Sequence, residues 1–268
     1  MESLVKNNEL ENFYKDKTVL LTGATGFKGS WMALWLYEMG ANVIDYSLAP
    51  LTDEDHFNLL KLENKITHIQ GDILDLNKLT DVFNKYNPEI VFHLAAQALV
   101  RLSYDNPKLT FDTNVAGSVN VLEAIRASDS VRSFVYVTSD KAYKNKEWTW
   151  GYRENDELGG HDPYSASKAA AEIVFSSYND SFFSKKADIG VGTVRAGNVI
   201  GGGDWALDRI IPDCIRSLRA NKPIVIRNPH ATRPWQHVLE PLSGYLLLGM
   251  KLYQDPDNYS GAWNFGPN

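Results

Sequence analysis

The residues with the clearest chemical potential are Tyr164 and Lys168, four positions apart in the segment PYSASK at 163–168. If this stretch is helical, phenol and ammonium share one face, because residues four apart lie about one turn apart. A nearby cation favours phenolate, so Lys168 would lower the pKa of a tyrosine that ordinarily titrates near about 10. Tyr164 could then act as a base. A half-buried tyrosine beside a solvated lysine gives the same pattern, so the pair needs supporting context.

A glycine-rich segment near the N-terminus supplies that context. The sequence TGATGFKG at 22–29 follows the apolar run Val19–Leu21 and precedes an apolar segment at 30–36, which predicts strand, turn and helix. In that order, glycines permit a tight turn and a close approach of backbone amides to a pyrophosphate at a helix N-terminus. The spacing is GxxGxxG rather than GxGxxG, and the alternative is a tight connection alone. The candidate cofactor contacts here are Gly23, Thr25, Gly26, Phe27, Lys28 and Gly29.

The alternation of elements along the chain predicts a doubly wound α/β fold of the Rossmann type. Apolar or β-branched runs indicate strands at 43–46, 66–70, 90–94, 134–138 and 191–195. Helical candidates lie between them, at 76–86, 109–127 and 165–183. This alternation is typical of parallel strands joined by crossover helices. The regular alternation of strand-like and helix-like segments ends near Asn198. We therefore expect a dinucleotide-binding domain at 1–197 and a smaller, loop-rich substrate lobe at 198–268. Part of that lobe could return to the sheet.

Whole-chain composition limits the partners and the compartment. The 268 residues are 44% hydrophobic and 22% charged, enough for one large domain or two smaller ones. A net charge of −6 argues against nucleic-acid binding as the main role. The one cysteine, Cys214, cannot form an internal disulfide, and the polar N-terminus lacks a signal-peptide core. We therefore expect a cytoplasmic protein with no membrane partner and no metal.

Ligands of such a fold gather at the carboxyl ends of the strands. Asp72 follows one strand and could accept from an adenine amino group, or could be a turn aspartate with Ile73 beside it. Small residues after the next strand would let a flat ring lie against the backbone, or would fill the core. Polar and charged residues end the strand at 134–138, where the alternative is a solvated strand end. The small-residue set is Leu94, Ala95 and Ala96. The polar and charged set is Thr138, Ser139, Asp140 and Lys141.

Together these motifs resemble a known family, the extended short-chain dehydrogenase/reductases that act on nucleotide sugars. The glycine loop, the LAAQ at 94–97, the TSDK at 138–141 and the YSASK at 164–168 occur in that family's order. Two further segments, RAGNVIGGGDW at 195–205 and RPWQHVLEP at 233–241, resemble those of one branch, the CDP-glucose 4,6-dehydratases. The resemblance spans the chain from about Lys17 onward. It implies a bound nicotinamide cofactor that is used and regenerated in every turnover.

The resemblance also implies roles for individual residues. Tyr164, helped by Lys168, would take the proton of the sugar 4-hydroxyl as hydride leaves C4. Ser139 or Thr138 would hydrogen-bond the 4-oxygen, and Asn114 would help to order the site. Asp140 would protonate the departing 6-hydroxyl, and hydride would return to C6. The product would be a 4-keto-6-deoxy sugar.

Two assignments stay open at this point. Lys141 stands where the dTDP-glucose dehydratases have a glutamate that serves as the C5 base, so it either removes the C5 proton or stabilises enolate charge. Ser47, with Asp45 two residues earlier, stands where NAD-selective sheets usually carry an acidic residue for the ribose. The following residues, LAPL at 48–51, contain no cation for a 2′-phosphate, which favours NAD over NADP.

The substrate side rests on fewer residues. Arg233 is the main candidate for the nucleotide diphosphate, with pairing to Glu240 as the alternative, and Asn198 and Arg209 are secondary candidates. Relatives in this family continue beyond the point where the sequence ends, so we expect an incomplete substrate lobe. The segments 109–127 and 165–183 would form a homodimer surface by resemblance, or would simply cover the sheet.

Two other functions remain compatible with the sequence. A nucleotide-sugar 4-epimerase shares the glycine loop, Tyr164 and Lys168, but needs no elimination pair such as Asp140 and Lys141. A non-catalytic nucleotide-sugar binding protein would bind the ligand without turnover. Product analysis with CDP-glucose separates these possibilities.

Overall fold

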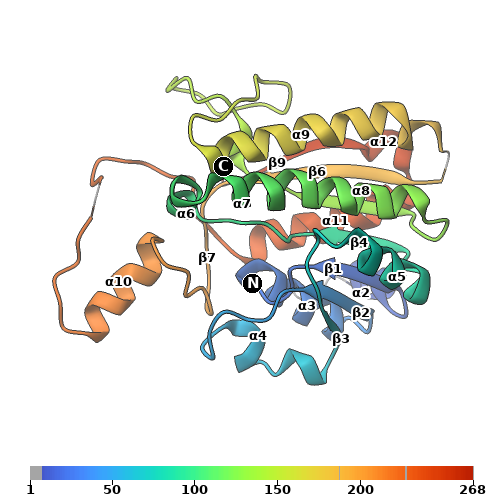
Figure 1. Ribbon diagram of the computed structural model, residues 1–268, viewed down its shortest axis with the longest axis horizontal. Coiled ribbons are helices and arrows are strands. Elements are labelled where there is room, and N and C mark those ends of the chain that lie inside the picture. The colour runs from blue at the N-terminus through green and yellow to red at the C-terminus, as the bar shows by residue number, and fades with distance from the viewer. Residues whose placement is uncertain (1–7, 187, 227, 268) are drawn as a thin grey trace.

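A seven-stranded parallel sheet forms the centre of the computed structural model, which describes residues 8–186, 188–226 and 228–267 (Figure 1). The strand order is β3-β2-β1-β4-β5-β6-β9, and every neighbouring pair is parallel. The α/β fold class predicted from the sequence is confirmed. The strands are β1 (Thr18–Thr22), β2 (Asn42–Ser47), β3 (Thr67–Gln70), β4 (Ile90–His93), β5 (Ser133–Val137), β6 (Gly190–Ala196) and β9 (Gly261–Phe265).

Helices cover both faces of the sheet, which is why the central strands are buried. Every residue of β5 and β6 is buried, as expected for a parallel sheet with two covered faces. One core cluster joins the sheet to α3 and α11, and a second joins it to α5, α8 and α9. Figure 1 shows α8 and α9 side by side along one face. These helices are α3 (Phe27–Glu38), α5 (Leu76–Tyr86), α8 (Ser118–Ala127), α9 (Pro163–Ser181) and α11 (Leu239–Gln254).

Shorter helices and turns complete the fold. They are α2 (Asn8–Tyr14), α4 (His56–Leu59), α6 (Val100–Asp105), α7 (Pro107–Phe111), α10 (Ile210–Arg219), α12 (Pro256–Tyr259), and the 3₁₀ turns Leu62–Asn64, Asp140–Ala142 and Phe183–Lys185. None of the helices in the described ranges has both the length and the apolar character needed to cross a bilayer.

The single helix predicted at 109–127 is interrupted in the structure. After α7, the segment Asp112–Gly117 is a π-helix, and α8 follows it directly. The wider turn places Asn114 on the inner side, where 1% of its surface is exposed. A π-helical turn inside a helix is often found at a functional site, and here it orients a polar side chain toward the interior.

Residues after Asn198 divide between the sheet and a separate segment. Strands β7 (Val199–Ile200) and β8 (Gln236–His237) pair in a small sheet, and α10 stands apart from the main body in Figure 1. In contrast, α11 packs against β5 and β6, and β9 pairs with β6. The boundary between 1–197 and 198–268 therefore stays a prediction, while the expected return to the sheet is present.

Candidate active site

The glycine loop lies at the point where the strand order reverses, between β1 and β4. Gly23 has φ +86°, and a Cβ there would lie 2.8 Å from the backbone nitrogen of Ala95. A Cβ on Gly29 would lie 2.1 Å from the carbonyl oxygen of Gly23. Gly26 precedes α3 without any side-chain cap and is exposed, so the first amides of the helix are open to an anion. The loop fits a dinucleotide pyrophosphate.

Asp45 holds this loop in place, a role that the sequence did not reveal. Its buried carboxylate accepts from the backbone nitrogen of Ala24 at 3.0 Å, and it pairs with Nδ1 of His68 at 2.7 Å. The Ser47 hydroxyl donates to the same carboxylate at 2.7 Å. Ser47 was predicted to contact the cofactor, and that contact stays a prediction, because its hydroxyl is engaged with Asp45 here.

Residues at the ends of β3 and β4 line the same edge. Asp72 accepts from the backbone nitrogen of Leu74 at 2.9 Å, so the turn contact is present, while an adenine contact stays a prediction. Ile73 is buried in the core. After β4 come Leu94, Ala95 and Ala96, which are half-buried; Ala95 is the residue whose backbone contacts Gly23.

Tyr164 and Lys168 both face the interior from the first turns of α9. Asp162 caps this helix by accepting from the Ser165 nitrogen at 3.0 Å, and Pro163 occupies the first turn, where its fixed φ suits a helix. Tyr164 is 8% exposed and Lys168 is 3% exposed. The predicted helical spacing is confirmed, and both polar groups are withdrawn from bulk water.

Burial dominates the titration of both groups. Burial raises the pKa of Tyr164 above its usual value; a hydrogen bond with Ser139 and the charge of Arg209 act in the opposite direction. Burial and the neighbouring Lys28 lower the pKa of Lys168 to about 8, while Glu172 opposes that shift. The protein groups alone therefore do not make Tyr164 more acidic, contrary to the expectation from sequence. Additional positive charge is needed to favour the phenolate.

Asn114 braces the start of α9 against the loop after β4. Its Nδ2 donates to the Ser167 hydroxyl at 2.9 Å and to the Gln97 carbonyl at 3.0 Å, and its Oδ1 accepts from the Gln97 nitrogen at 2.8 Å. Ser167 in turn donates to the Tyr164 carbonyl at 2.7 Å. These contacts use both donors of the amide and one of the two acceptor positions on its oxygen. Asn114 is thus placed to order the site, and a direct cofactor contact stays a prediction.

The segment after β5 brings the polar residues of the TSDK motif together. The Ser139 hydroxyl donates to Asp140 Oδ1 at 3.1 Å, and Lys141 Nζ lies 3.6 Å from the same oxygen. Asp140 and Lys141 are each about one third exposed, so solvent screens their pairing. Thr138 is different, because its hydroxyl donates to the buried Glu172. Ser139 is therefore the hydroxyl of this pair that faces Tyr164.

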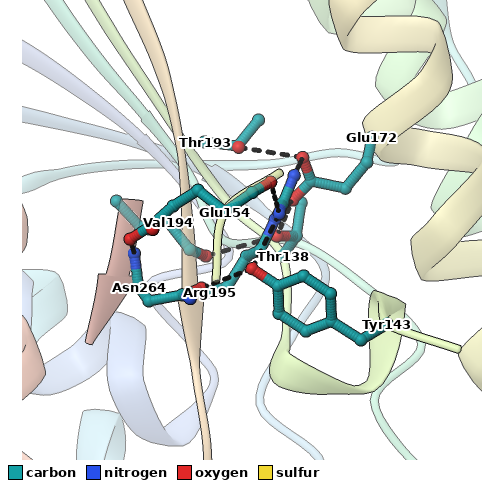
Figure 2. Close-up of polar contacts among 8 residues, drawn as sticks. All are labelled: Thr138, Tyr143, Glu154, Glu172, Thr193, Val194, Arg195 and Asn264. Atoms are coloured by element: carbon teal, nitrogen blue, oxygen red, sulfur yellow. Dashed lines mark hydrogen bonds and ion pairs between the residues drawn. The ribbon is translucent and has the colours of Figure 1, made fainter. Parts of the chain in front are cut away.

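A buried ion pair lies next to this segment (Figure 2). Arg195 donates from Nε and Nη2 to the Glu172 carboxylate at 2.9 and 2.7 Å. Thr193 and Thr138 donate to the same carboxylate. Arg195 Nη1 also reaches the Tyr143 hydroxyl at 2.8 Å, which donates to Asn264 on β9. The network links α9, β5, β6 and β9, although nothing in the sequence motifs had indicated it.

The predicted substrate residues lie in different surroundings. Asn198 has a buried Oδ1 without a hydrogen-bond partner among the described residues. Arg209 pairs with Asp204 at 2.8 Å, and its charge acts on both Lys28 and Tyr164, which places it beside the reactive groups. Arg233 is exposed and donates to the Thr232 carbonyl at 2.6 Å. The structure thus brings Arg209 to the site, and substrate contacts of all three residues stay predictions.

Comparison with known proteins decides the family. The family model for GDP-mannose 4,6 dehydratase matches residues 20–261. The chain belongs to this family. A curated member of similar sequence is the CDP-glucose 4,6-dehydratase of Salmonella typhimurium, 51% identical over 261 residues, which are 96% of this chain and 73% of that protein. The resemblance to extended short-chain dehydrogenase/reductases is thereby confirmed.

Solved structures agree with this family assignment. The epimerase Mth375 of Methanothermobacter thermautotrophicus superposes with a TM-score of 0.83 at 28% identity, over 97% of this chain and 74% of that one. MoeE5, solved in complex with UDP-glucose and NAD, gives a TM-score of 0.76 at 28% identity, over 93% of this chain and 76% of that one. Epimerases and dehydratases of nucleotide sugars share this fold, so the residues at the site must separate the two reactions.

Proposed function

We propose that this protein is an NAD-dependent nucleotide-sugar 4,6-dehydratase, a lyase that converts CDP-glucose to CDP-4-keto-6-deoxyglucose. The observation that carries the proposal is the 51% identity, over 96% of the chain, to the CDP-glucose 4,6-dehydratase of Salmonella typhimurium. The net reaction removes one water molecule, and the cofactor is unchanged overall.

The cofactor site is built from residues that fit a dinucleotide. Gly23 and Gly29 leave no room for a side chain, and the open amides near Gly26 suit a pyrophosphate. The half-buried Ala95 and Ala96 have side chains small enough for a flat ring to lie against them. Residues 48–51 carry no cation for a 2′-phosphate, so NAD is preferred over NADP. NAD supplies a hydride acceptor that takes hydride from sugar C4 and returns it at C6.

Tyr164 and Ser139 handle the proton at the sugar 4-oxygen. Tyr164 accepts the 4-hydroxyl proton when the carbonyl forms, and the Ser139 hydroxyl donates a hydrogen bond to the same oxygen. The charge of Arg209 favours a phenolate, and Lys168, four residues further along α9, is proposed to add to that effect. Thr138 acts indirectly, because its hydroxyl is bound to Glu172.

Asp140 and Lys141 carry out the elimination. Asp140 gives its proton to the departing 6-hydroxyl, which leaves as water, and Lys141 takes up the C5 proton that the C4 ketone has made acidic. The proton on Lys141 returns to C5 as hydride returns to C6, and the 4-hydroxyl proton taken by Tyr164 restores the acid at Asp140 through Ser139, which hydrogen-bonds to both residues. An epimerase has no use for such a pair.

Three residues are proposed to hold the nucleotide sugar. Arg209 and Arg233 offer guanidinium groups to the diphosphate oxygens. Asn198 offers an acceptor, its buried Oδ1, which suits a hydroxyl group of the sugar or the ribose.

Product analysis tests the proposal. The protein is incubated with NAD and CDP-glucose, and alkali is added to develop the ultraviolet absorbance of a 4-keto sugar. UDP-glucose and dTDP-glucose serve as competing substrates, and Tyr164→Phe serves as the inactive control. Absorbance that develops with CDP-glucose but not with UDP-glucose or dTDP-glucose supports the proposal. Formation of a 4-epimer without this absorbance supports an epimerase instead. Ligand binding without any product, in the presence of NAD, would leave a binding protein.

We also propose a homodimer and a cytoplasmic location. Apolar side chains are exposed on neighbouring helices α6, α7 and α9, including Ile173 at 60% and Leu109 at 40%. A second copy could cover this face. Mass measurement in solution tests the dimer, and Ile173→Glu should yield a monomer. The location rests on composition, because Cys214 is the one cysteine of the sequence.

A further inference from the structure

Tyr245 on α11 has a buried hydroxyl with no hydrogen-bond partner among the described residues. Its side chain is 0% exposed. Another fully buried tyrosine near the same helix, Tyr14, donates its hydroxyl to the Leu246 carbonyl at 2.7 Å. A buried polar group that lacks a partner costs about 1–3 kcal/mol of stability, whereas a phenylalanine would avoid that cost. A tyrosine at position 245 therefore suggests a partner that the protein itself does not provide.

The surroundings of Tyr245 identify the place where this partner binds. The Lys28 ammonium lies 5.9 Å from the centre of the Tyr245 ring, and Lys28 belongs to the glycine loop. Asp140, after β5, acts on the phenol through its charge. Phe265 packs edge-on against the ring, with centroids 5.2 Å apart, and fixes its orientation. Tyr245 thus lies near the Lys28 side chain of the glycine loop and within range of the Asp140 charge in the TSDK segment.

The phenol remains a donor at any ordinary pH. Burial raises the pKa of Tyr245 well above its usual value, and the negative charge of Asp140 adds to the shift. The neighbouring groups then offer one neutral donor, one ammonium donor at Lys28 and one carboxylate acceptor at Asp140. A phosphate would be repelled by that carboxylate. A primary carboxamide complements all three in chemical type, because it carries an acceptor oxygen for the two donors and a donor nitrogen for the carboxylate.

We propose that the Tyr245 hydroxyl donates a hydrogen bond to the carboxamide oxygen at the nicotinamide end of the bound dinucleotide. The inference rests on the proposed function, because it takes NAD as the cofactor. Tyr245 is then a cofactor-binding residue on α11, outside the family motifs from which the other contacts were predicted. Its hydroxyl is unfavourable in the protein alone and favourable in the complex.

The test compares Tyr245→Phe with Tyr14→Phe, which removes a satisfied hydroxyl near the same helix. Thermal unfolding is measured without NAD, and NAD affinity is measured by calorimetry. Tyr245→Phe should unfold at the same temperature as wild type or higher, and should bind NAD about three- to tenfold more weakly. Tyr14→Phe should unfold at a lower temperature and bind NAD as wild type does. ADP-ribose lacks the nicotinamide, so Tyr245→Phe should bind it as tightly as wild type.

Three results would overturn the inference. The first is unchanged NAD affinity in Tyr245→Phe, and the second is a loss of stability as large as that of Tyr14→Phe. The third is an equal loss of affinity for ADP-ribose, which would move the contact away from the carboxamide. Wild-type protein that binds NAD but does not convert CDP-glucose refutes the proposed reaction and leaves this contact testable. Wild-type protein that binds no NAD refutes both.

Discussion

Glu172 on α9 and Arg195 on β6 form an ion pair whose side chains are only 2% and 5% exposed. Four donor groups from three residues point at one carboxylate, since Thr138 and Thr193 also donate to it. Glu172 lies one turn beyond Lys168, and Thr138 directly precedes Ser139. The pair therefore fixes the position of α9 against the segment at 138–141, which carries the proposed elimination residues.

We predict that Arg195→Met lowers the free energy of unfolding by about 3–5 kcal/mol, because it leaves the Glu172 carboxylate buried without its cation. The double variant Glu172→Gln/Arg195→Met should recover most of that loss. Urea unfolding gives both values. Arg126→Met, in the exposed pair with Glu123, is the control and should cost about 0–1 kcal/mol. Equal losses for Arg195→Met and Arg126→Met would contradict the importance of burial.

The glycine loop gives a second prediction. In Gly29→Ala the added methyl would lie 2.1 Å from the Gly23 carbonyl oxygen, so the loop or α3 must shift. We expect NAD binding to fall at least tenfold and the unfolding temperature to drop. Gly151→Ala, where no atom lies within 4 Å of the new methyl, is the matched control and should change neither quantity. Wild-type NAD affinity in Gly29→Ala would argue against the loop as the pyrophosphate site.

Lys168 gives a prediction for pH. Its pKa in the folded protein is about 8, below the ordinary value, so between pH 8 and about 10.5 the unfolded chain binds more protons at this residue. Below pH 8 the folded protein bears the full cost of burying the charged Lys168 ammonium. The free energy of unfolding then rises with pH between pH 8 and about 10.5, by up to about 3 kcal/mol. The difference in unfolding free energy between wild type and Lys168→Met should therefore change steadily from pH 8 to pH 10. Lys85→Met, at an exposed position, is the control. A constant difference across that range would contradict the shifted pKa of Lys168.

Much of the fold could be predicted from sequence because strand patterns and glycine spacing are local signals. The strand before Gly23, the strand predicted at 134–138 and the helix predicted at 165–183 were all located to within two residues. Strand β9 was not located, because Gly261–Phe265 is short and reaches the sheet only by pairing with β6. The π-helical turn at Asp112–Gly117 was also missed, because a change of hydrogen-bond register leaves no mark in the hydrophobic pattern.

The site shows the same division between local and long-range information. Motifs indicated Tyr164, Lys168 and the TSDK segment, but the roles of Asp45 and Glu172 depend on partners distant in sequence. Asp45 contacts Ala24, and Glu172 contacts Arg195. The pKa of Tyr164 could not be predicted from Lys168 alone, since it depends on how deeply the phenol is buried.

The most direct test of the central claim follows a label through one turnover. CDP-glucose carrying deuterium at C4 is incubated with the protein and NAD, and the product is analysed by mass spectrometry and proton NMR. The account predicts a 4-keto-6-deoxy sugar with the deuterium at C6, because the hydride removed from C4 returns to the same molecule. Deuterium retained at C4 of an epimer, or a product whose C6 carries no label, would contradict it.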